Sequence, residues 1–75
     1  MKYKVKVGPK LYEMDLKELN GLLSVASEQI PFGVYAVQKG NYVELCRDKC
    51  ESITQLKKTK RTYKKNGFKV YANGV

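Results

Sequence analysis

The sequence of 75 residues contains no histidine and no tryptophan, and it has only two cysteines. Histidine is the side chain that most readily exchanges a proton near neutral pH, and it is the commonest metal ligand. Its absence removes the usual general base, and no serine or cysteine has another base evident beside it. Glycine-rich phosphate-binding loops are also missing. We therefore expect a protein that is not an enzyme and that uses no cofactor.

The two cysteines, Cys46 and Cys50, are too few for a disulfide scaffold, which in a chain of this length usually has four or more. Without histidine, two thiolates alone make a poor zinc site. We interpret them as two small half-buried thiols and expect no metal. A bond between them under oxidation is the alternative that their spacing leaves open.

Long apolar runs are absent as well. No run approaches the roughly 20 residues of a membrane span, and the start at Lys2-Tyr3-Lys4 leads into no apolar block of a signal peptide. We therefore expect a cytoplasmic protein with no membrane partner. The chain is 43% hydrophobic and 29% charged, which predicts one folded domain over residues 1–75. A core of this size supplies about 3–5 kcal/mol of net stability, so a homodimer or a bound partner would add useful stabilisation.

Acidic side chains end at Glu51. Residues 52–75 carry seven basic and no acidic side chains, a net +7, whereas residues 1–51 carry eight basic and seven acidic, a net +1. The segment from Lys57 to Lys65 holds most of this excess, because six of its nine residues are cationic. Such a local excess of positive charge indicates a polyanionic partner.

Apolar and cationic residues alternate at positions 2–7, which is typical of a half-buried strand. The strand would have a core face and a cationic face, formed respectively by Tyr3, Val5, Val7 and by Lys2, Lys4, Lys6. Gly8-Pro9 ends it, and a short second strand that folds back on the first is expected around residues 11–14.

A helix is predicted to follow, because Asp15 and Glu18 have the spacing of a capping box. Leucines then recur at helical spacing and form an apolar face that would pack on a sheet. Gly21 falls on the polar face, where it costs the helix about 1 kcal/mol. Pro31 ends the helix.

Residues 33–46 are expected to form a β-hairpin around the two-residue loop Gly40-Asn41. This loop would pair Lys39 with Tyr42, Val37 with Glu44, and Tyr35 with Cys46. The predicted core face holds Val34, Ala36, Val43 and Leu45, and the outer face holds Tyr35, Val37, Tyr42 and Glu44.

A second helix is expected to begin near Lys49, because Asp48 and Glu51 repeat the capping-box spacing, and to end at Asn66-Gly67. A short strand over residues 68–71 follows. The order β-(β)-α-β-β-α-β predicts an α+β fold in which an antiparallel sheet of four or five strands carries two helices on one face, as in ferredoxin-like folds.

On a projection of the second helix, five cations fill an arc of roughly 120°. We call these five residues the cationic stripe: Lys57, Lys58, Arg61, Lys64 and Lys65. Lys60 falls at the edge of the apolar face, where its alkyl stem would cover the core. The helix dipole explains cations in the last turn, but not those before it. The stripe therefore predicts an anion-binding surface, and a merely solvated charged face is the alternative.

If both helices cover one face of the sheet, the other face would carry a mixture of lysines and tyrosines. These secondary candidates are Lys2, Lys4, Lys6, Tyr35, Tyr42, Lys69 and Tyr71. Tyrosines between lysines stack on bases while the lysines hold phosphates. The alternative is that the tyrosines have no such role, since tyrosine is simply a good strand former.

We therefore expect binding of nucleic acid, DNA or RNA, mainly through backbone phosphates, because no base-reading motif such as a zinc finger or a helix-turn-helix appears. The alternative is a small interaction protein of the phage or mobile-element type. It would bind an acidic surface of a host protein and inhibit or modulate that protein. An exposed apolar patch beside the stripe would favour this alternative, and Val25 and Val37 are the candidates.

Overall fold

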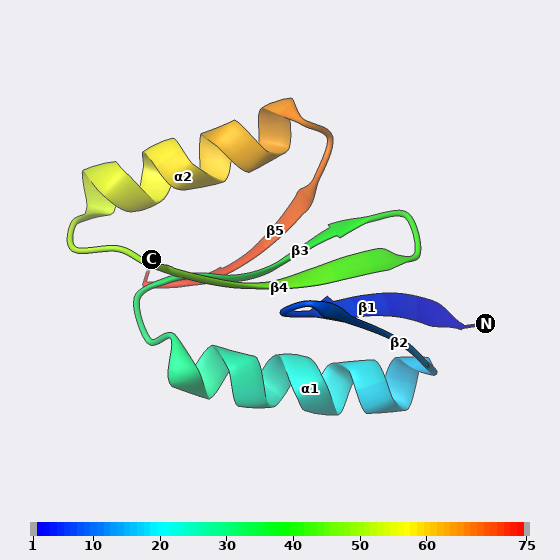
Figure 1. Ribbon diagram of the computed structural model, residues 1–75. Coiled ribbons are helices and arrows are strands. Elements are labelled where there is room, and N and C mark those ends of the chain that lie inside the picture. Colours follow the sequence, from blue (N-terminus) through cyan, green and yellow to red (C-terminus); the bar gives the residue numbers. More distant parts are fainter. Residues whose placement is uncertain (1, 75) are drawn as a thin grey trace.

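The computed structural model describes residues 2–74 and contains five strands and two helices (Figure 1). The elements are β1 (Tyr3–Val7), β2 (Lys10–Met14), α1 (Leu16–Gln29), β3 (Gly33–Lys39), β4 (Tyr42–Lys49), α2 (Ile53–Lys65) and β5 (Lys69–Asn73). All strands belong to one sheet in the order β2-β1-β4-β3-β5. The predicted α+β class and the predicted order of elements are confirmed.

The sheet is mixed. Strand β1 runs antiparallel to β2 but parallel to β4, so that Val5 lies beside Val43. The other pairs, β3 with β4 and β3 with β5, are antiparallel. The prediction of a purely antiparallel sheet is therefore wrong. Short turns identify hairpins in a sequence, whereas β1 and β4 lie far apart along the chain and no turn marks their pairing.

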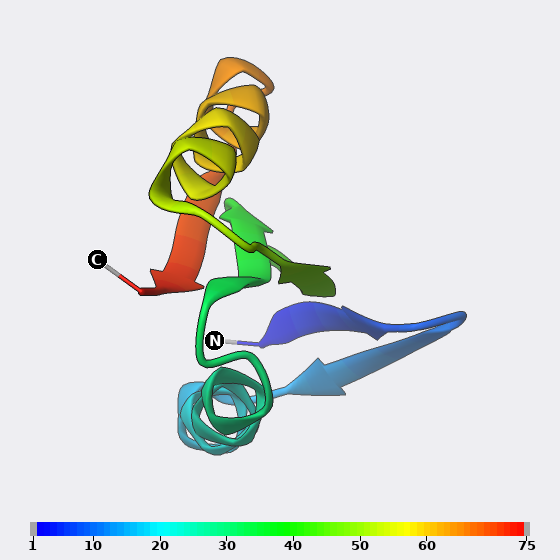
Figure 2. The ribbon, with the colours of Figure 1, turned by 90° about the vertical axis from the view of Figure 1, so that its left-hand side faces the viewer.

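The two helices cover opposite faces of the sheet, so the prediction that they share one face is wrong (Figures 1 and 2). Helix α1 connects the parallel strands β2 and β3, and α2 connects the parallel strands β4 and β5. In the strand order, β3 lies closer to β5 than β2 does, and β5 lies beyond β4, so both crossovers advance toward the β5 edge of the sheet. The strands β2 and β3, however, run in the direction opposite to β4 and β5. Crossovers of the same hand must then lie on opposite faces.

Two buried clusters result, one under each helix. The α1 side holds Val5, Leu19, Ala36 and Val43, and the α2 side holds Val34, Val37, Cys50 and Leu56. Val37 is 1% exposed, so the prediction that it points away from the core is wrong. The prediction holds only for a sheet with one covered face, whereas a strand buried on both faces is apolar nearly without interruption, as β3 is from Val34 to Val37.

The hairpin of β3 and β4 has the predicted register near its loop, with Lys39 beside Tyr42 and Val37 beside Glu44. The register shifts between Val34 and Ala36, so the predicted pairing of Tyr35 with Cys46 is wrong. An extra residue in one strand shifts every pair beyond it, and local patterns do not reveal such a bulge.

Helix α1 begins as predicted, since the Glu18 N–H donates to Asp15 Oδ1 at 2.9 Å. Helix α2 begins at Ile53, and the prediction of a start near Lys49 is wrong. The reason is that β4 continues to Lys49, which pairs with Gly33 of β3.

Candidate functional site

Helix α2, which carries the cationic stripe, is held at its N-terminus by a capping arrangement different from the predicted one. The Gln55 N–H donates to Ser52 Oγ at 3.1 Å, and Gln55 Oε1 accepts from the Glu51 N–H at 2.9 Å. Ser52 thus satisfies a free donor of the first turn. The signal was present in the sequence, because Ser52 and Gln55 also have capping-box spacing.

The C-terminus of α2 ends in a Schellman turn, and its predicted end at Asn66-Gly67 is confirmed. Gly67 has a φ of +84°, and its N–H donates to the Lys64 carbonyl at 3.1 Å. The Phe68 N–H donates to the Tyr63 carbonyl at 3.2 Å, and the two rings meet edge to face with centroids 6.3 Å apart. Both ends of the helix are therefore fixed.

The inner face of α2 sets the rotation of the helix on the sheet. Leu56 is 1% exposed, and the half-buried Tyr63 donates its hydroxyl to Asp48 Oδ2 at 2.5 Å. This hydrogen bond, together with burial, raises the pKa of Tyr63 well above its ordinary value. Asp48 is thus a side-chain partner of α2 and not its cap, a role that no local sequence pattern indicates.

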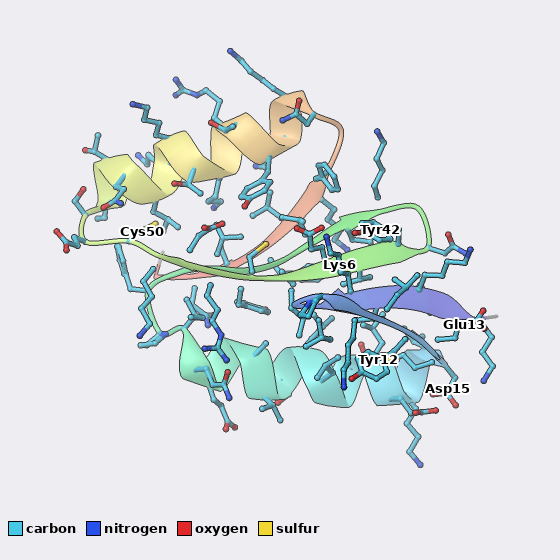
Figure 3. The ribbon with its side chains drawn as sticks, viewed as in Figure 1. Lys6, Tyr12, Glu13, Asp15, Tyr42 and Cys50 are labelled. Carbon is cyan, nitrogen blue, oxygen red and sulfur yellow. The ribbon has the colours of Figure 1, made fainter. Side chains whose placement is uncertain are left out.

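The outer face of α2 presents the stripe. All five stripe residues are exposed, whereas Lys60 is half-buried, in agreement with its projected place at the edge of the core. Figure 3 shows nitrogen-tipped side chains that extend from α2 away from the sheet. Four cations, Lys57, Lys60, Arg61 and Lys64, line a shallow hollow of about 300 Å³. The hollow is large enough to hold a small anion such as phosphate.

The positive charge of α2 is not neutralised within residues 2–74. The single ion pair in this part of the chain joins Lys6 to Glu44 at 4.0 Å, on the sheet. No stripe cation therefore has a carboxylate within ion-pairing distance among the described residues. Lys64 and Lys65 lie in the last turn, where the helix dipole favours them, but Lys57, Lys58 and Arg61 lie before it.

The structure divides the secondary candidates instead of gathering them on one open face. The tyrosines of β3 and β5, Tyr35 and Tyr71, pack against the cluster under α1, with their ring centroids 6.2 Å apart. The Tyr71 hydroxyl donates to Gln38 Oε1 at 2.6 Å, and the Lys69 ammonium lies 5.2 Å from the centre of the Tyr71 ring. The rings of Tyr35 and Tyr71 therefore make contacts within the protein and are not free to stack on bases.

The remaining secondary candidates lie on β4, on β1 and, in the case of Lys2, directly before β1. Lys2, Lys4 and Lys6 are exposed, as the alternation predicted. Tyr42 donates its hydroxyl to Glu44 Oε1 at 2.9 Å, and burial together with this bond raises the pKa of Tyr42. A continuous platform of tyrosines and lysines is absent from residues 2–74 because each face of the central strands is covered by a helix.

An exposed apolar groove exists, but it does not adjoin the stripe. On α2 itself the one exposed apolar side chain is that of Ile53, which is 51% exposed. Val37 is buried, whereas Val25 is 53% exposed and lines a groove of about 250 Å³ beside α1. Leu22, Leu45 and Arg47 also line this groove. Because α1 and α2 lie on opposite faces of the sheet, the groove and the stripe cannot form one contact surface.

The cysteines are both free, Cys50 in the cluster under α2 and Cys46 half-buried on β4, where burial raises the pKa of its thiol. In the described part of the chain, no three cysteine, aspartate or glutamate side chains come together in a way that could hold a metal ion. The helices over the same residues are too short and too polar to cross a membrane.

The arrangement therefore consists of a helix fixed at both ends, anchored by Leu56 and Tyr63, and cationic on its outer face. Lysine and arginine only donate hydrogen bonds, so the groups that this face can bind are anions and other acceptors. No protein family model, no curated protein and no solved structure matches this chain, so its function is inferred from the geometry of α2.

Proposed function

We propose that the protein binds nucleic acid through backbone phosphates and that the cationic stripe on α2 is the contact surface. The observation that carries this proposal is the group of five exposed cations that have no carboxylate partner among residues 2–74. Like charges spaced four residues apart on a helix repel each other, so a phosphate backbone that neutralises them relieves a cost already present in the free protein.

The length of α2 suits a polymer of phosphates. Its 13 residues span about 20 Å. Duplex DNA carries one negative charge per roughly 1.7 Å of axis, so this length of duplex presents on the order of ten charges. Each lysine or arginine that neutralises a phosphate releases a bound counterion, which makes the affinity strongly dependent on salt.

The test is fluorescence anisotropy with labelled DNA and RNA, single-stranded and duplex, over a series of salt concentrations. We expect a Kd tighter than roughly 100 µM at low salt and a steep loss of affinity as salt increases. Weaker binding, or an affinity that does not respond to salt, would contradict the proposal.

A double variant, Lys57→Glu with Arg61→Glu, locates the surface. It reverses two charges at exposed positions of α2, so binding should fall at least tenfold while the circular dichroism spectrum stays unchanged. The matched control is Lys10→Glu with Lys17→Glu, which makes the same change of charge at exposed positions of β2 and α1. Equal losses in both variants would show that only the net charge matters and that the stripe is not the site.

A further inference from the structure

The cations of α2 are arranged in two rows on either side of Arg61. At about 100° per residue, Lys57 and Lys64 lie roughly 40–60° to one side of Arg61, and Lys58 and Lys65 lie at similar angles to the other side. All five side chains are exposed. The stripe is therefore a symmetric set, with a pair of lysines on each flank and a guanidinium between them.

Helix α2 is also unobstructed. It is the only helix on its face of the sheet within residues 2–74, and Figures 1 and 2 show that no other element lies over its outer side. An α-helix with its side chains is about 10–12 Å across. The major groove of B-form DNA is about 12 Å wide and accepts one helix.

Among residues 2–74, no aromatic ring is available beside the stripe to stack on unpaired bases. Tyr63 is bonded to Asp48 and packed on Phe68, and the Lys39 ammonium lies 5.8 Å from the centre of the Phe68 ring. Proteins that bind single strands usually rely on such stacking. The major groove of duplex RNA is too deep and narrow for a helix to enter. Of the common nucleic acids, B-form DNA therefore fits this surface best.

We propose that α2 lies in the major groove of B-form DNA. This inference rests on the proposed function, which it makes more specific. Lys57 with Lys64 and Lys58 with Lys65 contact the phosphates of the two strands that border the groove. Arg61, between the rows, faces the base edges, where a guanidinium pairs with guanine through two hydrogen bonds.

Anisotropy with a duplex DNA, its single strand and a duplex RNA of the same sequence tests the choice of ligand. We expect the duplex DNA to bind at least tenfold more tightly than either of the others at the same salt concentration. If single-stranded DNA or duplex RNA binds equally well, the groove assignment is wrong although the proposed function stands. If none of the three binds, the proposed function itself is wrong.

Two double variants test the two-row geometry. Lys57→Gln with Lys64→Gln and Lys58→Gln with Lys65→Gln each remove two phosphate contacts. Each should therefore reduce the slope of log affinity against log salt by about 1.8. Lys10→Gln with Lys17→Gln removes the same charge from exposed positions of β2 and α1 and should leave the slope unchanged. A loss in only one of the two rows would show that α2 contacts a single strand of the duplex and would overturn the proposal.

Discussion

Tyr63 links the stripe to the sheet through a single side-chain hydrogen bond. Its hydroxyl donates to Asp48 of β4, and its ring packs on Phe68. Its backbone carbonyl accepts a hydrogen bond from the Phe68 N–H in the turn that ends α2. One residue thus fixes both the rotation of the helix and its C-terminal end. Removing the hydroxyl should weaken the support of α2 without changing the stripe itself.

Tyr63→Phe should lower the free energy of unfolding by about 1 kcal/mol at pH 7, because the half-buried carboxylate of Asp48 loses its donor. The pKa of Tyr63 is raised from 10.0 in the folded protein, so above about pH 10 the unfolded chain loses the proton before the folded one does. The wild-type protein therefore loses this stabilisation as the pH rises. Urea denaturation of both proteins between pH 7 and 11 should show the difference shrinking, and a constant difference would contradict the assignment.

Two glycines should respond in opposite ways to substitution by alanine. Gly33 has a φ of +142°, and a Cβ there would lie 2.2 Å from the Asp48 carbonyl oxygen, whereas a Cβ at Gly21 meets nothing within 4 Å. Gly33→Ala should cost about 2 kcal/mol or more, since the main chains of β3 and β4 would have to separate. Gly21→Ala should gain about 0.5–1 kcal/mol, because alanine favours a helix. Thermal denaturation of both measures the contrast, and similar melting temperatures would contradict it.

At the scale of elements, the stability of α2 depends more on the caps at its two ends than on the residues between them. Like charges repel along its outer face, and Leu56 is its only residue that is fully buried. The Ser52 cap and the turn at Gly67 therefore contribute a large share of the stability of the helix.

Ser52→Ala should destabilise the protein by about 1 kcal/mol, because the Gln55 N–H loses its acceptor. Ser24→Ala provides the matched control, since Ser24 is exposed within α1 and alanine is the better helix former there. Chemical denaturation of the two variants should give a loss for the first and little change or a small gain for the second. If Ser52→Ala left the free energy of unfolding unchanged, Ser52 would not be the residue that caps α2.

Local sequence patterns predicted the elements well and their arrangement less well. Alternation at positions 2–7, the Asp15 cap, the Gly40-Asn41 loop and the end at Gly67 each depend on neighbouring residues, and the structure agrees with all four. The start of α2 was misplaced because two segments have capping-box spacing and only the pairing of β4 with β3 decides between them.

The arrangement of the whole molecule depends on contacts between distant residues. Periodicity shows which residues of an element share a face, but not which element covers that face, so the burial of Val37 under α2 was missed. The same limit applies to the candidate site. The positions of the five stripe cations followed from helical geometry, whereas the engagement of Tyr63 with Asp48, and of Tyr35 and Tyr71 with the cluster under α1, did not.

The parallel pairing of β1 with β4 has a consequence for how the chain folds. The hairpins β1–β2 and β3–β4 each close through a short turn, but Lys4 can meet Tyr42 only after the long intervening segment has ordered. Closing such a loop costs entropy before any contact compensates for it, and non-local pairing slows folding. We therefore expect the pairing of β1 with β4 to form last during folding and to break first during unfolding. The segment from β3 to β5, which carries α2 and its own buried cluster, would then be the first part of the molecule to fold and the last to come apart.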